Sequence, residues 1–447
     1  MRNMNQNQMG VAVFLALLIA AGWLAVPGGR ASQAAEQAGT LETARQYRDQ
    51  ELYERSIQSY GQALLEGASL ELYQELAGVY ETYYAENPTS AVRRDFAAML
   101  SSACEAYPDE VSFWERYAAL YLDTESYAEA WNVLRDAREA GGSSETLEAQ
   151  YRQAYYAYRL NYQPYVEILP QGWPGGYIVR DGELWGAVTA SGDTLLSPVY
   201  RMAGPLSEDG SIAVADADGD TWLIDGGGIP AAHYPGTAEQ AGSHADGLIP
   251  IKMQGKDVWG YYTDDGQEVL SGYLEAGSFQ DGLAAVCTGE GWSIIDEDGV
   301  YASDEVWEEI RLDAAGRYDQ DGVILAKSGG AWHIYDDEFE QAGDFSCEEI
   351  DVHIDGPIAF CRGGLWGFAD EDGNEVIAPA YEQARSFSGG VAAVCRDGLW
   401  GFIDESGQTV IDFLFTDAGY FSASDGSCPM QLEEGGAYRL IQWEVAR

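Results

Sequence analysis

The stretch that decides the fold is Leu365-Trp-Gly-Phe-Ala-Asp-Glu-Asp-Gly-Asn-Glu-Val-Ile-Ala-Pro-Ala-Tyr381. Its first residues alternate along a strand, so that Trp366 and Phe368 share one face. Glu371-Asp372-Gly373 then predicts a tight hairpin turn, because glycine adopts a positive φ at little cost. We expect Gly367 to leave room for a neighbouring element to approach closely. The stretch therefore predicts short antiparallel strands joined by a tight turn.

The same pattern recurs on both sides of this stretch. Successive marker tryptophans lie 33 to 40 residues apart, and a further partial unit contains Tyr438. In the looser copies, Leu, Ser and His replace the glycine after the tryptophan. One unit of about three strands cannot bury both faces alone, so seven or eight units are predicted to pack against one another. The markers of the repeat, for which we expect packing roles, are Trp185, Gly186, Trp222, Trp259, Gly260, Trp292, Trp332, Trp366, Gly367, Trp400 and Gly401.

Four Trp-Gly pairs stand in register with Asp-Gly turns and with strands such as Val391-Ala-Ala-Val394. Through these motifs residues 175–445 resemble the bacterial WG-repeat family. The resemblance implies an all-β repeat domain, which we place at residues 165–447. The basic residues that the family often has before the tryptophan and in the turn are Leu, Val and acidic residues here.

The repeat array is predicted to close into a propeller-like ring, with an open β-solenoid as the alternative. Cys287, Cys361 and Cys395 occupy the same repeat position. Successive coils of a solenoid would place such residues ~5 Å apart, close enough for Cys361 and Cys395 to pair, whereas propeller blades keep them apart as free thiols. We expect a strand at residues 176–180 to complete the final unit and to close the ring.

Residues 35–164 are predicted to form a separate helical domain, because apolar and aromatic residues recur there at helical spacing. Trp114, Ala118, Tyr121, Tyr127 and Ala130 stand at the spacings of a tetratricopeptide helix pair. The small residues let two helices approach closely, and the aromatic residues fill the groove beside them. Residues 41–144 thus resemble about three tetratricopeptide-like units, with an ordinary helical bundle as the alternative.

Residues 9–26 form an uncharged apolar run. As a helix this run would be ~27 Å long, about one hydrocarbon core. It predicts that residues 1–34 are an uncleaved membrane anchor; the small residues at 31–34 leave a cleaved signal peptide as the alternative. We therefore predict a single-pass protein of the cell membrane with its bulk outside the cytoplasm, or else a secreted protein.

The net charge of the chain limits the classes of partner that it can bind. There are 74 Asp and Glu residues against 24 Lys and Arg, a net charge of −50, and positions 165–447 contain 52 of the acidic and 12 of the basic residues. This field repels phosphate backbones and excludes nucleic acid as a partner. The acidic turns are expected to keep the β domain soluble, and the acidic surface as a whole to attract cations weakly.

No pattern typical of catalysis is found. The sequence has no GxSxG, HExxH or Gly-rich phosphate loop, and His233, His244, His333 and His353 lack ligand spacing. Asp216-Ala-Asp218-Gly-Asp220 is similar to the start of a calcium loop, but Thr221 stands where such a loop requires glycine, so a plain turn is predicted. No catalytic residue, cofactor or metal site is predicted.

From these observations we predict a non-enzymatic, membrane-tethered extracytoplasmic scaffold. Its β-repeats would bind a protein or another ligand of the cell envelope. The alternatives are an enzyme acting on cell-envelope polysaccharide and a purely structural spacer.

Overall fold

The computed structural model describes residues 30–171 and 175–445. They form two compact units, one ending at Ala157 and the other beginning at Tyr158. The predicted membrane anchor at residues 9–26 lies outside the described residues. Within the described part of the chain, no helix is both long and apolar enough to cross a membrane.

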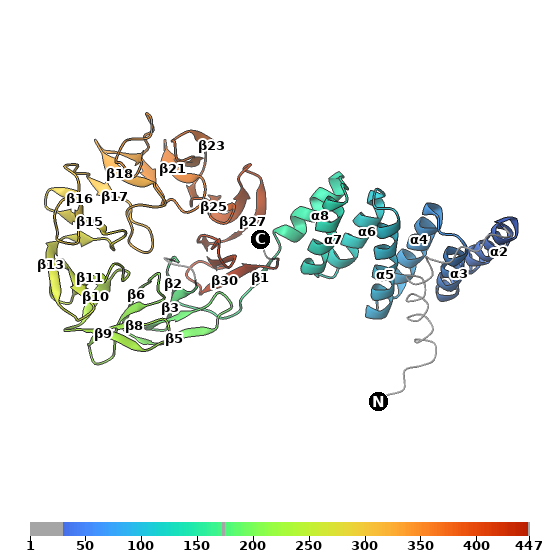
Figure 1. The fold of residues 1–447 in the computed structure, drawn as a ribbon, viewed down its shortest axis with the longest axis horizontal. Helices are drawn as coiled ribbons and strands as arrows, with labels where there is room; N and C mark the ends of the chain where they lie inside the picture. Colours follow the sequence, from blue (N-terminus) through green and yellow to red (C-terminus); the bar gives the residue numbers. More distant parts are fainter. Residues whose placement is uncertain (1–29, 172–174, 446–447) are drawn as a thin grey trace. The chain divides into compact units, whose positions relative to one another are not determined.

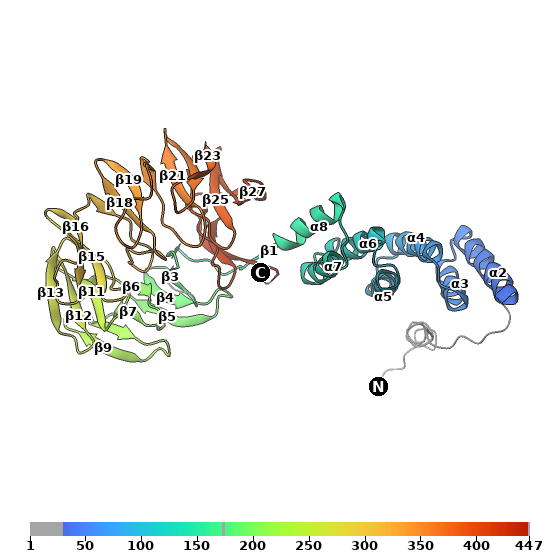
Figure 2. The ribbon, with the colours of Figure 1, turned by 45° about the horizontal axis from the view of Figure 1, so that its top comes forward.

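The first unit is helical, as predicted. Figures 1 and 2 show its helices following one another along the chain. They are α2 (Arg30–Asp49), α3 (Tyr53–Glu66), α4 (Leu70–Glu86), α5 (Ser90–Ala106), α6 (Val111–Leu122), α7 (Tyr127–Glu139) and α8 (Glu145–Tyr155). Ser69, Thr89 and Ser144 each cap a helix by accepting a backbone N–H with the side-chain hydroxyl.

The core of the helical unit explains the predicted spacing. Ala63, Ala77 and Ala118 are completely buried, as are the large side chains of Tyr60 and Phe113. Small residues at such positions let helix axes approach, and the aromatic rings fill the space that remains. Three helix pairs followed by α8 fit the predicted number of units, and the tetratricopeptide resemblance stays a prediction.

The second unit is a ring of eight antiparallel sheets, which we call blades one to eight (Figure 1). Blade one contains β2 (Glu167–Ile168), β3 (Tyr177–Asp181), β4 (Leu184–Val188) and β5 (Thr194–Tyr200). Blade two contains β6 (Met202–Leu206), β7 (Ile212–Ala215), β8 (Thr221–Ile224) and β9 (Pro230–Tyr234). Blade three contains β10 (Ala238–Ala241), β11 (Leu248–Met253), β12 (Trp259–Thr263) and β13 (Glu268–Tyr273).

The next two blades have only three strands. Blade four contains β14 (Glu275–Ala276), β15 (Leu283–Thr288) and β16 (Gly291–Asp296), and blade five contains β17 (Glu309–Ile310), β18 (Ile324–Ser328) and β19 (Ala331–Tyr335). Blade six contains β20 (Glu349–Ile350), β21 (Ile358–Arg362), β22 (Leu365–Ala369) and β23 (Glu375–Tyr381). Blade seven contains β24 (Gln383–Ala384), β25 (Val391–Arg396), β26 (Leu399–Asp404) and β27 (Thr409–Phe415).

Blade eight closes the ring with strands from both ends of the β unit. It contains β28 (Asp417–Ala418), β29 (Ser427–Gln431) and β30 (Tyr438–Trp443), and its outer strand is β1 (Tyr158–Leu160). β1 pairs antiparallel with β30, Tyr158 opposite Trp443 and Leu160 opposite Ile441. In this closure the backbone groups of β30 pair with those of β1, so the first strand of the unit is hydrogen-bonded to the last.

The predicted ring is therefore present, but the predicted closing strand was wrong. Residues 177–181 form β3, the second strand of blade one, which pairs with β2 and β4. The strand that closes the ring precedes the first repeat and contains only three residues. So short a segment, directly after a helix, has too few residues to show an alternating pattern.

Candidate binding site

The marker tryptophans all lie on the third strand of their blades. Trp292, Trp332 and Trp400 are buried, and the other four are half-buried. In the four blades with a Trp-Gly pair, which we call the WG blades, the tryptophan lies opposite an aromatic residue of the fourth strand. These pairs are Trp185 with Tyr200, Trp259 with Tyr273, Trp366 with Tyr381, and Trp400 with Phe415. Such cross-strand pairs stabilise the sheet.

In blades one, six and seven the glycine of the pair is required by a bulge in the fourth strand. Between Trp366 and Phe368, β22 advances by two residues, while β23 advances by four, from Tyr381 to Ile377. The extra residues press the backbone of β23 against Gly367: a Cβ there would lie 2.6 Å from the Ile377 carbonyl oxygen. Gly186 and Gly401 face the same obstacle, at 2.5 and 2.8 Å from a carbonyl oxygen. This close approach explains why we expected Gly367 to leave room for a neighbouring element.

Blades two, four and five have no Trp-Gly pair, but only blade two lacks the extra residues opposite the third strand. In blade two, Trp222 and Leu223 pair in regular register with His233 and Ala232 of β9. Blades four and five have no fourth strand, and the segments after β16 and β19 make only isolated bridges to them. Those bridges keep the offset of the WG blades: from Trp292 to Ile295 the third strand advances by three residues, while the facing segment runs over six, from Trp307 to Tyr301. Regular pairing beside a side chain in place of the glycine is therefore found in blade two.

Many turn carboxylates accept backbone hydrogen bonds. One oxygen of Asp216 accepts the N–H groups of Asp218, Gly219 and Asp220 at 2.9 to 3.0 Å, and its other oxygen accepts the Trp222 indole N–H at 2.9 Å. The backbone N–H of Asp220, foremost among these donors, holds the pKa of Asp216 below its ordinary value. The segment similar to a calcium loop is thus a turn stabilised by its first aspartate.

A second set of carboxylates caps the hairpin between the second and third strands. Glu382 accepts the N–H groups of Asp397 and Gly398 at 3.1 and 3.0 Å. Glu348 accepts those of Gly363 and Gly364 in the same way. These acidic residues have a structural role beyond the predicted one in solubility.

The cysteines and histidines form no reactive cluster. All six cysteines are free, as expected if separate blades hold Cys287, Cys361 and Cys395 apart. Burial raises the pKa of these three thiols. Among the described residues, no group of three or more His, Cys, Asp or Glu side chains could hold a metal ion. His233 and His244 lie beside aspartates, and His333 and His353 contact backbone carbonyls.

The centre of the ring contains a cavity of roughly 700 Å³. Five blades line it, namely blade one and blades five to eight, mainly through the first strands and the loops that follow them. Its wall is mixed: Leu169, Leu312 and Val352 lie among the lining residues together with five carboxylates and three arginines. A cavity of this size could admit a small ligand.

One wall of this cavity is a polar network that joins blades six, seven and eight. Asp351 accepts a hydrogen bond from the Tyr420 hydroxyl at 2.8 Å and another from the Ser386 N–H at 2.8 Å. Asp417 accepts the Tyr438 hydroxyl at 2.6 Å. Burial raises the pKa of Tyr420 well above its ordinary value, so this side chain stays a neutral donor.

Sequence reasoning missed the cavity residues. Their positions follow the first strand, which is only two residues long in six blades. The available signal was a departure from the repeat: Arg311, Asp351 and Arg385 stand where blades three, four and eight have glycine.

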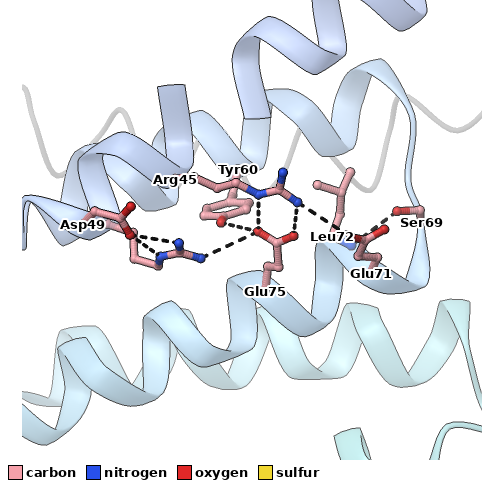
Figure 3. Close-up of polar contacts among 8 residues, drawn as sticks. Arg45, Asp49, Tyr60, Ser69, Glu71, Leu72 and Glu75 are labelled. Atoms are coloured by element: carbon pink, nitrogen blue, oxygen red, sulfur yellow. Dashed lines mark hydrogen bonds and ion pairs between the residues drawn. The ribbon is translucent and has the colours of Figure 1, made fainter. Parts of the chain in front are cut away.

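The helical unit contains a polar cluster of its own (Figure 3). Arg45 of α2 and Tyr60 of α3 both donate to Glu75 of α4, the Arg45 Nε at 2.9 Å and the Tyr60 hydroxyl at 2.6 Å. The Arg45 hydrogen bonds lower the pKa of Glu75. The cluster ties three successive helices together, and the charges are paired, so it leaves little capacity for a ligand.

The repeats match a described family. A model described as "WG containing repeat" matches residues 259–292, 366–400 and 400–426. The β domain contains WG repeats. No curated protein matches the chain.

Several solved structures share features with this chain at low identity. A eukaryotic initiation factor is 11% identical, with a TM-score of 0.41 over 57% of this chain and 77% of that one. The Dos1 propeller is 10% identical, with a TM-score of 0.36 over 62% and 88%. The Sgt2 TPR domain from Aspergillus fumigatus is 19% identical, with a TM-score of 0.21 over 27% and 76%.

Proposed function

We propose that this protein is a non-enzymatic scaffold whose WG domain binds a protein or another ligand of the cell envelope. The observation that supports binding most directly is the ring itself. Five of its eight blades line a cavity of roughly 700 Å³. Rings of repeats present extended recognition surfaces of this kind.

The same proposal places the protein at the membrane. The uncharged run at residues 9–26 would be the tether, and both described units would lie outside the cytoplasm. Membrane fractionation of the native protein tests the tether. Digestion of intact cells with an added protease tests on which side the bulk lies.

Capture from envelope extract tests the binding function. The full chain, a chain without the β unit and a chain without residues 41–157 serve as baits, after circular dichroism has confirmed that each is folded. We expect the full chain and the chain without the helices to retain the same ligand, and the chain without the β unit to lose it. A ligand retained by the helices alone would contradict the proposal. A defined turnover by the purified protein would favour the enzyme alternative.

A further inference from the structure

One position in the loops of the ring is occupied by phenylalanine in some blades and by histidine in others. The loop after the first strand begins with a residue whose N–H donates to a carbonyl of the second strand at 2.8 to 2.9 Å. This hydrogen bond aligns seven blades, and the position in question comes two residues later. In chain order its residues are Gln171, His244, Phe279, Asp313, His353, Phe387 and Phe421.

The phenylalanines show what packing requires at this position. Phe279, Phe387 and Phe421 are each at most 1% exposed. Each packs edge to face against an aromatic ring of the preceding blade, with centroids 4.8 to 4.9 Å apart, and these rings belong to Tyr261, Phe368 and Phe402. An apolar ring is enough to fill the place, so packing does not explain the histidines of blades three and six.

His353 is buried in the loop of blade six, with 5% of its surface exposed. Its Nδ1 lies 2.9 Å from the carbonyl oxygen of Gln320, in the corresponding loop of blade five. A carbonyl can only accept, so Nδ1 carries the proton and Nε2 of the neutral ring has a lone pair. This Nε2 is buried without a hydrogen-bond partner among the described residues and lies 3.4 Å from Oε1 of Glu371. The neutral ring therefore places two acceptors opposite each other.

His244 has the same two kinds of neighbour in blade three. Its Nδ1 lies 3.5 Å from Oδ2 of Asp209, in the loop of blade two. Its Nε2 lies 2.8 Å from Oδ1 of Asp264, in the turn between β12 and β13. A neutral imidazole has one N–H and can donate to only one of these carboxylates, whereas an imidazolium donates to both.

Both histidines thus connect the same two places. Nδ1 faces the loop of the preceding blade, and Nε2 faces the turn between the third and fourth strands of its own blade. Only the doubly protonated ring is a donor in both directions, and histidine gains this second proton between pH 8 and pH 5. The side chain of Glu371 is 67% exposed, so it is free to move the remaining distance of about 0.5 Å to a charge-assisted hydrogen bond.

The other charged groups near the two rings are arginines that are engaged elsewhere and further carboxylates. Arg317 pairs with Asp313 at 2.6 Å, Arg385 donates to the Ala418 carbonyl, and Arg311 lies over the Trp332 ring. His353 lines the central cavity, and His244 lines a separate pocket of roughly 270 Å³. The remaining carboxylates on these walls are Asp321 and Asp351 near His353, and Glu208 and Asp246 near His244.

We propose that His244 and His353 make the loops after the first strands of blades three and six sensitive to pH. In mildly acidic solution each ring takes up a proton from the solvent and donates hydrogen bonds to both of its neighbours. At higher pH each ring loses one of these hydrogen bonds, and the loop is held less firmly. Because His353 lines the central cavity, the cavity wall formed by blade six takes part in the change.

Hydrogen–deuterium exchange of the purified full chain, read by mass spectrometry at pH 5.5 and pH 7.5, tests this proposal. Rates are divided by the intrinsic exchange rate at each pH. We expect peptides covering residues 242–247 and 351–357 to exchange at least about fivefold more slowly at pH 5.5. Residues 386–390 of blade seven are the internal control, because Phe387 holds the same position there.

The control loop should show no such difference. It also corrects for the general effect of acid on a chain with a net charge of −50, which acts on all blades. Equal corrected rates at the two pH values in both histidine loops would overturn the proposal, as would the same pH dependence in residues 386–390.

Variants assign the effect to the two rings. His244→Phe and His353→Phe introduce the residue that blades four, seven and eight use, and each should abolish the pH dependence in its own loop only. His233→Gln is the matched control, because His233 is exposed, lies beside Asp220 and belongs to neither loop. Persistence of the pH dependence in His353→Phe, or its loss in His233→Gln, would contradict the assignment.

The turn carboxylates give a second pair of variants, with circular dichroism as the check on folding. Asp264→Asn and Glu371→Gln change side chains that are 65% and 67% exposed, so the fold should tolerate them. Each should reduce the pH dependence of the loop that its histidine belongs to. If a phenylalanine variant is unfolded, these two decide, and an unchanged pH dependence in both overturns the proposal. The experiment needs no ligand, so its outcome is independent of the proposed binding function.

Discussion

Blades six and two pack a fourth strand against the third in two ways. In blade six a bulged fourth strand covers the third strand, and a Cβ at Gly367 would lie 2.6 Å from the Ile377 carbonyl oxygen. In blade two, Trp222 and Leu223 pair in regular register with His233 and Ala232, and Leu223 takes the place of the glycine. The comparison teaches that, where a full fourth strand is present, the residue after the tryptophan depends on how closely that strand approaches.

The largest effect in this comparison is expected from the aromatic partner of the tryptophan. Phe415 is only 1% exposed and lies opposite Trp400, whereas His233 lies opposite Trp222 and is exposed. Phe415→Ala should lower the free energy of unfolding by about 4 kcal/mol, because it leaves a cavity in the core. His233→Ala should change it by less than about 0.5 kcal/mol. Denaturant unfolding of the full chain, followed by tryptophan fluorescence, measures both.

The second-largest effect is expected from the glycine of the Trp-Gly pair. Gly367→Ala places a Cβ 2.6 Å from the Ile377 carbonyl oxygen, and the bulge must shift to admit it. We expect a loss of about 3 kcal/mol. Ser293→Ala, at the equivalent position of blade four, should cost under about 1 kcal/mol. Similar melting temperatures for the two variants would show that the bulge does not set the requirement for glycine.

A smaller effect is expected from the hairpin caps. Glu382→Ala removes the acceptor for the Asp397 and Gly398 N–H groups and should cost about 1 kcal/mol, as the loss of a cap does elsewhere. Leu274 occupies the same position before blade four, where its N–H donates to Cys287 as that of Glu382 donates to Cys395. Leu274→Ala is therefore the matched variant, and we expect it to melt close to the parent chain.

The smallest expected effect is the pH dependence of the stabilisation by Asp216. Hydrogen bonds to the ionised carboxylate lower the pKa of Asp216 in the folded chain. Its stabilising contribution is therefore complete above the unfolded-state pKa of about 4 and is lost as the pH falls through the lower folded-state pKa. Asp216→Asn should be slightly less stable than the parent at neutral pH and should approach it in acid. A constant difference between pH 7 and pH 3 would exclude this role for the carboxylate.

Much of the β domain could be predicted from the sequence, because its signals are local. The alternation around Trp366, the turn at Gly373 and the spacing of the tryptophans each depend on a few neighbouring residues. The helical unit was predictable for the same reason, through buried small residues such as Ala63 and Ala118. The closing strand β1 depends on contacts between distant segments, and no local pattern marks it.

The sequence by itself determined the repeat, its approximate number of copies, the separate helical domain and the excess of negative charge. Tertiary structure decided which segment closes the ring, why glycine follows tryptophan in only four blades, and which charged side chains border the cavity. The physical reason is that strand propensity and turns are set by neighbouring residues, whereas ring closure, close approaches between strands and the lining of the cavity arise only when separate segments meet.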